Sequence, residues 1–189
     1  MNKKGMILVI IGCILIIIAG LMVTYNNYEN KKAAKESKKV YEQIQTQEIT
    51  EEVTQISNKE MKTINIDGNE YIGTISIPTL NLNLPVTSDW DYSKMKTSPC
   101  RYYGSIYTDD LVICAHSYDT LFGRIKNLNS GDLLILTDIN KEEHIYQVEV
   151  IEILSPTDVE EMIESEFDLT LYTCTIDGLN RVTVRLNRV

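Results

Sequence analysis

The amino-acid sequence predicts an all-β domain with short helices, carried on one N-terminal membrane-spanning helix. Residues 5–23 form an uncharged stretch made almost entirely of Ile, Leu, Val, Met, Ala and Gly. Beyond Lys62 the pattern changes to short, alternating or β-rich runs with few helices between them. Runs of this kind are typical of closed barrels and sandwiches, so the main domain belongs to one of these two architectures.

The apolar stretch at residues 5–23 has the length of a membrane span, which takes about 20 residues in a helix. Lys3 and Lys4 precede it, and a short basic N-terminus favours a cytoplasmic location for that end. No small-x-small cleavage site follows, as a secretory signal would require, and so apolar a helix is rarely buried in so small a domain. The sequence therefore predicts a cytoplasmic stub and uncleaved signal-anchor over residues 1–25.

A polar segment over residues 26–62 follows the anchor and is rich in Lys, Glu, Gln and Thr. It contains a weak helical stripe of apolar residues, namely Val40, Ile44, Ile49, Val53 and Ile56. The stripe is too sparse to predict a core. We therefore expect a partly helical stalk that holds the outer domain away from the membrane.

The outer domain is predicted to span residues 63–189. Its expected strands are 71–77, 82–86, 111–115, 132–136, 144–154, 169–173 and 181–186. Short helices are expected near 92–96, 121–128 and 157–166. Seven or eight short strands at irregular spacing match the all-β class.

The charge is unevenly distributed along the chain. The whole chain has a net charge of −9 at pH 7, but residues 63–189 hold nine basic against twenty acidic side chains. So acidic a domain argues against nucleic acid as a partner, because nucleic-acid binding needs basic surfaces. Solubility explains the charge adequately.

The cysteines indicate a free thiol outside the membrane. Cys13 lies in the apolar stretch, which leaves the odd set of Cys100, Cys114 and Cys174 outside. No pair has the C-x-x-C spacing of a redox or zinc site. Cys114 is expected to pack in the core, whereas Cys174 ends a strand just before a turn. Cys174 is therefore the candidate nucleophile.

Cysteine acyl transfer also needs a proton-transfer group and donors for an oxyanion. His116 follows the apolar strand 111–115 directly, where side chains project from a rigid element. His144 sits within a strand and is expected to be a surface residue. Arg181 opens the strand after the Cys174 turn, which favours it over Arg185, further along the same strand.

These residues carry a resemblance to the sortase family of cysteine transpeptidases. Residues 170–174, Thr-Leu-Tyr-Thr-Cys, resemble the Thr-Leu-x-Thr-Cys signature of that family. Residues 180–184 resemble its following Arg-led strand, and 112–116 resemble its apolar strand ending in His. Residues 72–78 resemble an opening strand. The resemblance runs from about Tyr71 to the C-terminus, and the motifs occur in the right order and spacing.

The resemblance implies an eight-stranded β-barrel that cleaves an LPxTG-like sorting signal between Thr and Gly. It implies Cys174 as the nucleophile that forms a thioester, His116 as general acid and then base, and Arg181 as the oxyanion donor. Thr173 would add a hydrogen bond in the same pocket. The acceptor would be an amine of a cell-wall precursor or pilin, and the chemistry needs no metal or organic cofactor. Together with the anchor, this implies a single-pass membrane protein with an extracellular catalytic domain.

Within the family, the short connection between the Cys and Arg strands and the small size favour a class D-like enzyme over class B. The expected helix at 157–166 would lie in the loop that reads the sorting signal. Two other interpretations remain open. One is a different thiol enzyme, such as a peptidase or an L,D-transpeptidase, although Thr173-Cys174-Thr175 lacks the Gly-Cys-x-Arg pattern of the latter. The other is a non-catalytic membrane-anchored adhesion or scaffold domain on the same barrel.

Overall fold

The computed structural model describes residues 3–46 and 61–189, so Ile49, Val53 and Ile56 of the stalk lie outside the described residues. The α-helices are α1 (Lys3–Thr46) and α2 (Val159–Ile163). The strands are β1 (Ile64–Ile66), β2 (Asn69–Ile77), β3 (Leu82–Thr87), β4 (Cys100–Tyr103), β5 (Leu111–Cys114), β6 (Leu133–Asp138), β7 (Glu143–Leu154), β8 (Leu169–Cys174) and β9 (Arg181–Arg188). Three short 3₁₀ turns are η1 (Pro78–Leu80), η2 (Lys94–Lys96) and η3 (Ile125–Asn127).

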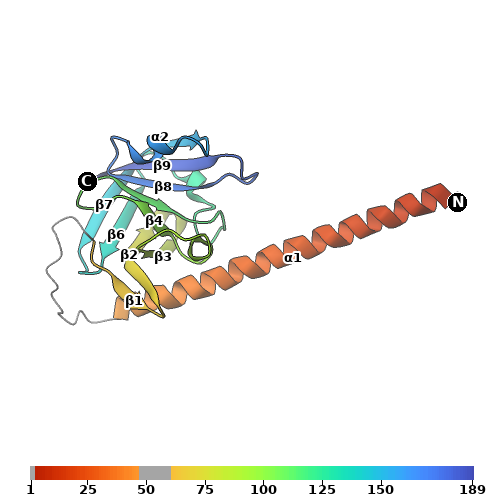
Figure 1. Cartoon of the computed structure of the whole chain (residues 1–189), viewed down its shortest axis with the longest axis horizontal. Coiled ribbons are helices and arrows are strands. Elements are labelled where there is room, and N and C mark those ends of the chain that lie inside the picture. Colours follow the sequence, from red (N-terminus) through yellow and green to blue (C-terminus); the bar gives the residue numbers. More distant parts are fainter. Residues whose placement is uncertain (1–2, 47–60) are drawn as a thin grey trace.

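The strands form a closed barrel (Figure 1). Their order is β1-β2-β3-β4-β5-β8-β9-β7-β6, and an additional pairing of β2 with β6 closes the ring. The three-residue β1 pairs only with β2, so eight strands, β2 to β9, make up the barrel itself. Most neighbours are antiparallel, but β3 pairs in parallel with β4, and β5 pairs in parallel with β8. The predicted eight-stranded all-β barrel is confirmed.

Closure depends on Gly73 in β2. This residue pairs with Asp138 of β6 and has a φ of 146°, which L-residues rarely adopt. A Cβ at position 73 would lie 2.2 Å from the backbone oxygen of Thr137. The two strands approach closely enough to pair only because position 73 carries no side chain.

The alternation of buried side chains defines an inner and an outer face of the barrel. Leu111, Ile113 and Ala115 on and just after β5 belong to the large internal core cluster, as does Leu171 of β8. Val112 instead packs outside, in a smaller cluster with residues of the β7–β8 connection. Side chains in register with Val112 therefore face outward.

The helix α1 runs unbroken through the predicted membrane span and into the predicted stalk. Within the described residues it is the helix long and apolar enough to cross a membrane, and its apolar window is unburied. Figure 1 shows its N-terminal half projecting away from the barrel, while its C-terminal part lies beside β1 to β3. Membrane span and stalk therefore form one continuous rod as far as Thr46.

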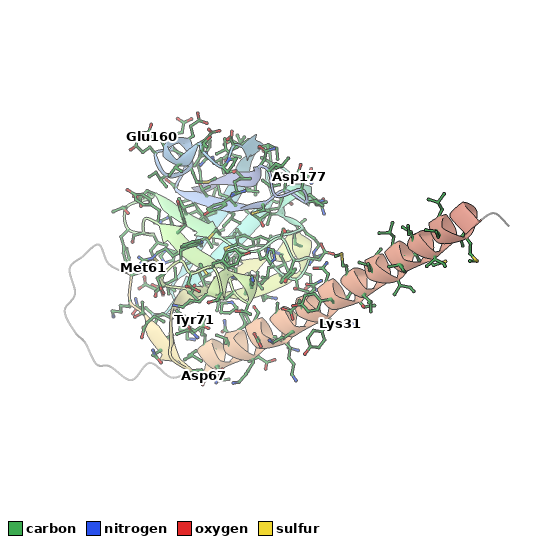
Figure 2. The ribbon with its side chains drawn as sticks, turned by 45° about the vertical axis from the view of Figure 1, so that its right-hand side comes forward. Lys31, Met61, Asp67, Tyr71, Glu160 and Asp177 are labelled. Carbon is green, nitrogen blue, oxygen red and sulfur yellow. The ribbon has the colours of Figure 1, made fainter. Side chains whose placement is uncertain are left out.

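The C-terminal part of α1 contributes to the hydrophobic core, contrary to the expectation from its sparse stripe. Ile44 is 3% exposed and packs in a cluster with Ile66 of β1 and Tyr71 of β2. Ala33, about three helical turns upstream, is also buried. Figure 2 shows Tyr71 and Asp67 beside this end of the helix. The stripe suffices because its partners on the barrel supply the remaining apolar surface.

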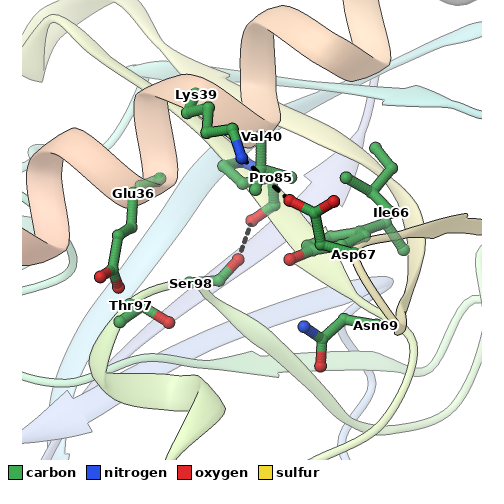
Figure 3. Close-up of a pocket in the computed structure, with 11 residues that line it drawn as sticks. Glu36, Lys39, Val40, Ile66, Asp67, Asn69, Pro85, Thr97 and Ser98 are labelled. Carbon is green, nitrogen blue, oxygen red and sulfur yellow. Dashed lines mark hydrogen bonds and ion pairs between the residues drawn. The ribbon is translucent and has the colours of Figure 1, made fainter.

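Polar contacts line the edge of this helix–barrel interface (Figure 3). Lys39 Nζ lies 2.9 Å from Asp67 Oδ2, and Ser98 Oγ donates to Pro85 O at 2.7 Å beneath them. A cavity of about 210 Å³ separates these groups. Near the helix end, Lys141 Nζ donates to Ile44 O at 2.5 Å. The exposed Lys39–Asp67 pair adds little stability, so the apolar cluster is the main attachment.

Local elements differ from expectation at two short strands and at two of the expected helices. The short strands β1 and β4 were not predicted. The expected helix at 121–128 is a series of turns ending in η3, and the helix expected at 157–166 is reduced to α2. Apart from β4, which is a barrel strand, these differences lie outside the barrel ring, and none of them falls in β5, β8 or β9, which carry the predicted site.

Candidate active site

Cys174 and Arg181 lie opposite each other at the turn end of the β8–β9 hairpin. In the antiparallel register Cys174 pairs with Arg181 and Thr173 with Val182. Because Val182 belongs to the internal core, its neighbours in sequence point outward. The thiol and the guanidinium therefore project from the same outer face of adjacent strands, as the sequence predicts for this pair.

The parallel pairing of β5 with β8 brings His116 to the other side of Cys174. Cys114 is in register with Tyr172, and Ala115 N donates to Tyr172 O at 3.3 Å. The register ends at Cys114, and continuing it by two residues would bring His116 level with Cys174 on the outer face. Because neighbouring strands are about 4.8 Å apart, we expect the imidazole, thiol and guanidinium to lie in one row across the ends of β5, β8 and β9.

Thr173 fixes the spacing between these strands. Its hydroxyl donates to Ala115 O at 2.8 Å, directly before His116, and the residue is 3% exposed. A buried hydroxyl bound in this way stabilises the end of the β5–β8 ladder. Thr173 thus ties the strand end before Cys174 to the residue before His116, and it also lines a hollow beside Cys174, where the sequence predicts a contact with substrate.

The three thiols outside the membrane helix differ in accessibility. Cys100 and Cys114 are 0% and 1% exposed, whereas Cys174 is only partly buried. Burial raises the pKa of Cys114 to about 12 and also raises the pKa of Cys100, because a thiolate is poorly solvated there. Both are therefore kept as inert thiols, and Cys174 is the thiol that a substrate can reach.

His116 is a half-buried imidazole held by its backbone and by an aromatic neighbour. Its backbone N–H donates to Met95 O at 2.9 Å, and its ring lies 4.2 Å from the ring of Tyr118 between centroids. Burial, followed by the charge of Lys96, lowers the pKa of His116. Nδ1 is buried without a hydrogen-bond partner among the described residues. Among the residues that the structure describes, no carboxylate forms an ion pair with the imidazole of His116.

The turn between β8 and β9 is short and strongly hydrogen-bonded. Thr175 N donates to Asn180 O at 2.9 Å, and Gly178 N donates to Thr175 O at 2.8 Å with a φ of 75° at Gly178. Asp177 accepts bonds from the Thr175 hydroxyl and, at 3.1 Å, from Leu179 N, and these bonds lower its pKa. The turn therefore presents Cys174 and Arg181 from a rigid support.

Arg181 has donors available for a ligand. One terminal nitrogen, Nη1, donates to Asn180 O at 3.1 Å and to Gly178 O at 3.4 Å. No carboxylate of the described residues forms an ion pair with it. The remaining guanidinium N–H groups are free to bind an oxyanion beside Cys174.

Arg185, the rival arginine, is fully committed to structure. It is 3% exposed, and its Nε donates to Glu152 Oε1 at 2.8 Å. Nη1 donates to Thr170 Oγ1 at 3.0 Å, and Nη2 donates to Glu161 O of α2 at 2.7 Å. The structure thus supports the choice of Arg181, and it adds that Arg185 fastens α2 to the barrel.

An open hollow of about 510 Å³ adjoins Cys174. It is lined by the turn after β8, by Ile153 of β7 and by the loop that follows His116, which contributes Ser117, Asp119, Gly123 and Lys126. Ile153 and Ile176 are 58% and 91% exposed, so the hollow offers apolar contacts at its rim. A hollow of this size suits a peptide or amine ligand next to the thiol.

Aromatic side chains line the outer face on another side of the thiol. Tyr172, two residues before Cys174 on β8, makes a T-shaped contact with Tyr102 at 5.5 Å, and Tyr102 makes one with Trp90 at 6.5 Å. Trp90 is 49% exposed. Sequence reasoning missed this surface, because its members come from three separate segments. Its exposure makes it a candidate peptide-binding surface.

The second histidine lies at the far end of β7 from the residue that pairs with Arg181. His144 Nε2 is 3.8 Å from Asp138 Oδ2, and these two residues with Glu142 place possible metal-ligand atoms within 4.8 Å of one another. Asp138 is already bound by Glu142 N at 2.9 Å and Asn140 Nδ2 at 3.2 Å. His144 is therefore separate from the Cys174 row, and we assign no metal to this group.

Comparison with known proteins agrees with this geometry. Residues 75–189 match the family model described as a sortase domain, which covers more than half of the chain. The chain belongs to the sortase family, whose members are cysteine transpeptidases that act on sorting-signal substrates.

Individual relatives extend the likeness to most of the chain. Sortase A of Bacillus anthracis is 26% identical over 190 residues, which cover 92% of this chain and 89% of the relative. The structure of sortase C1 from Streptococcus agalactiae is 28% identical with a TM-score of 0.59, covering 84% of this chain and 89% of that chain. A structure of Clostridium perfringens sortase C with the C-terminal cell wall sorting motif is 21% identical, with a TM-score of 0.56 over 85% and 88% of the two chains. At that identity the last likeness concerns the fold alone.

Proposed function

We propose that Cys174, His116 and Arg181 catalyse transpeptidation of an LPxTG-like sorting signal, cleaving it between Thr and Gly. The observation that supports this assignment most is the register of the strands: Cys174 pairs with Arg181, and the β5–β8 register, continued beyond Cys114, would bring His116 level with Cys174. The accessibility of Cys174 beside an open hollow supports the same roles. In contrast, Cys100 and Cys114 are buried, and Arg185 has structural partners.

The chemistry follows from these positions. The Cys174 thiolate attacks the carbonyl carbon of Thr, and Arg181 N–H groups stabilise the oxyanion. The C–N bond to Gly breaks, and His116 gives its proton to the leaving amine, which leaves a thioester on Cys174. An incoming amine then attacks the thioester and loses a proton to His116, and Cys174 is released as a thiolate. Acid and base functions thus alternate on one imidazole.

The hollow beside Cys174 and the aromatic surface give two places for two substrates. We propose that the sorting signal lies along the aromatic surface that includes Tyr172 and Tyr102. The acceptor amine, from a cell-wall precursor or pilin subunit, then enters through the hollow between the His116 loop and the β8–β9 turn. The sorting motif bound in the Clostridium perfringens structure supports a peptide of this kind as one partner.

We propose further that residues 1–25 anchor the chain in the cell membrane with the N-terminus in the cytoplasm. Residues 63–189 then form the extracellular catalytic domain, with residues 26–62 between them. The apolar window of α1 and the basic residues before it support this topology. A class D-like assignment is favoured because the β7–β8 connection contains only the five-residue α2.

The deciding experiment uses the full chain in detergent micelles with a quenched LPxTG-type peptide and triglycine as the amine acceptor. We expect cleavage, a ligated product, and a thioester on Cys174 that mass spectrometry detects when acceptor is omitted. Cys174→Ala should abolish all three. Cleavage that persists in Cys174→Ala, or a missing thioester in a wild-type chain that cleaves, would refute the proposal.

Matched variants separate the roles of the remaining residues. His116→Ala should lose nearly all turnover, while His144→Ala, the same change at the distant histidine, should retain it. Cys13→Ser, in the membrane helix, should leave the acyl-enzyme mass shift in place. Equal loss in both histidine variants would remove His116 from its assigned role.

A further inference from the structure

The anchor helix contacts the loop that follows His116. Thr120 Oγ1 donates to Asn30 Oδ1 at 2.5 Å and lies 3.4 Å from Asn30 O. Asn30 lies seven residues after the end of the apolar stretch at Val23, or about 10 Å along the helix axis. The contact therefore joins the first turns beyond the membrane span to the active-site loop, some distance from the main Ile44 attachment.

The loop that receives this contact is tightly folded. Leu121 N and Gly123 N both donate to Tyr118 O at 2.9 Å, and Phe122 N donates to His116 O at 3.3 Å. A Cβ at Gly123 would lie 2.5 Å from Ser117 O, so the chain segments on both sides are in close contact. Phe122 is 0% exposed and fixes the loop to the core. Because so many bonds link residues 116–123, the position of Thr120 determines the position of Tyr118.

Tyr118 is the side chain through which the loop meets His116. The two rings lie 4.2 Å apart between centroids and are tilted by 54°. The pKa of Tyr118 is raised first by burial, then by the charges of Glu29 and Tyr25 of α1 and of Tyr92. Lys96 of η2 also lies close enough to the imidazole of His116 to lower its pKa. His116 is thus enclosed by Tyr118, backed by α1, and by the η2 segment.

We propose that Asn30 is a positioning residue for His116: it holds the 117–124 loop so that Tyr118 covers the imidazole beside Cys174. The anchor helix is then part of the catalytic domain as well as its membrane attachment. This inference rests on the proposed role of His116 in the reaction. It assigns no contact between Asn30 and substrate.

The test compares two asparagines of α1 in the full chain in detergent micelles. Asn30→Ala should lower kcat by about three- to tenfold, the effect expected for one hydrogen bond, with KM for the quenched peptide unchanged. Asn27→Ala, the same change at an exposed position of the same helix, should match wild type. Asn30→Asp keeps the acceptor oxygen and should restore most of the turnover.

A spectroscopic readout distinguishes positioning from general stability. Without the Asn30 contact, Tyr118 covers the imidazole less well, and water returns to it. The NMR titration midpoint of His116 should therefore move upward in Asn30→Ala, because burial is the largest cause of its lowered pKa. Thr120→Val should produce the same shift, and the double variant should add little to either single change.

The outcomes are distinct. Activity of Asn30→Ala equal to that of Asn27→Ala would overturn the inference. So would lower activity with a lower melting temperature and an unmoved His116 midpoint, which indicates a purely structural role. If His116→Ala itself retains full activity, the proposed function fails first. If His116→Ala is inactive and Asn30→Ala is normal, only the positioning role fails.

Discussion

Arg181 and Arg185 of β9 belong to the same residue type and project from the same face, yet their surroundings are opposite. Arg185 donates to a carboxylate, a hydroxyl and backbone carbonyls and is 3% exposed. Arg181 is partly exposed and donates from one nitrogen to two turn carbonyls. A guanidinium whose donors are all occupied maintains the fold, whereas one with donors to spare can bind a ligand. The number of donors left over therefore distinguishes a catalytic arginine from a structural one.

Among the variants that test this comparison, those at Arg181 are expected to change activity most. Arg181→Ala should reduce kcat by about 10²- to 10³-fold, the usual loss for an oxyanion donor. The melting temperature should stay close to that of wild type, because its two bonds go to exposed turn carbonyls. Arg181→Lys, which keeps the charge but not the fork, should recover only part of the rate. A fully active Arg181→Ala would end the assignment.

Arg185 should show the reverse pattern. Arg185→Met removes the donors to Glu152, Thr170 and the α2 carbonyls and should lower the free energy of unfolding by about 2–3 kcal/mol. Since α2 loses its attachment, KM for the peptide should rise more than kcat falls. Thermal unfolding and steady-state kinetics measure the two effects. An unchanged melting temperature would contradict the structural role.

A smaller effect is expected at Thr173, which lies on the neighbouring strand β8. Thr173→Val removes the donor to Ala115 O and leaves that carbonyl buried and unpaired, which should cost about 1–2 kcal/mol of stability. Turnover should fall because His116 is less firmly placed. Thr173→Ser keeps the hydroxyl and should be close to wild type in chemical unfolding and in kcat. If Thr173→Val weakens peptide binding as much as it lowers turnover, the residue contacts substrate, as the sequence first suggested.

The smallest expected effect concerns the protonation of His116, on the other side of Cys174. Since its pKa is lowered in the folded chain, the unfolded chain binds more protons just below the ordinary value of 6.5. The stability contributed by this group is therefore present above that value and is lost as pH falls toward the folded pKa. Lys96→Ala should raise the NMR midpoint slightly, because Lys96 is the second cause after burial. Lys94→Ala, on the same turn but paired with Asp89, should not.

Most barrel strands were predictable because the sequence shows either their alternation or, for β5, a short apolar run bounded by turns. The strands missed were β1, with three residues, and β4, of which only Cys100 is buried. Residues 121–128 carry apolar side chains at helical spacing, but the close contact of Gly123 with Ser117 O folds them into turns. Periodicity indicates which side chains are buried, and it does not reveal a backbone approach from elsewhere.

The positions of the candidate site residues along the chain were predictable for a related reason. Cys174, His116 and Arg181 each stand at the end of a strand, next to a turn that the sequence displays. The structural role of Arg185 could not be predicted from the sequence, because its partners Glu152 and Glu161 lie more than twenty residues away in the chain. The same holds for Ile44, whose partners Ile66 and Tyr71 meet it only in the fold. Roles that depend on distant partners need coordinates.

The pairing of β2 with β6 at Gly73 also affects the tendency of the protein to self-associate. A closed barrel offers no free strand edge to another chain, and closure here depends on one missing methyl group. Any side chain at position 73 would separate β2 from β6 and uncover two sets of unpaired backbone groups. Exposed edges of this kind would be free to pair between neighbouring molecules. Gly73 thus protects the protein from edge-to-edge aggregation.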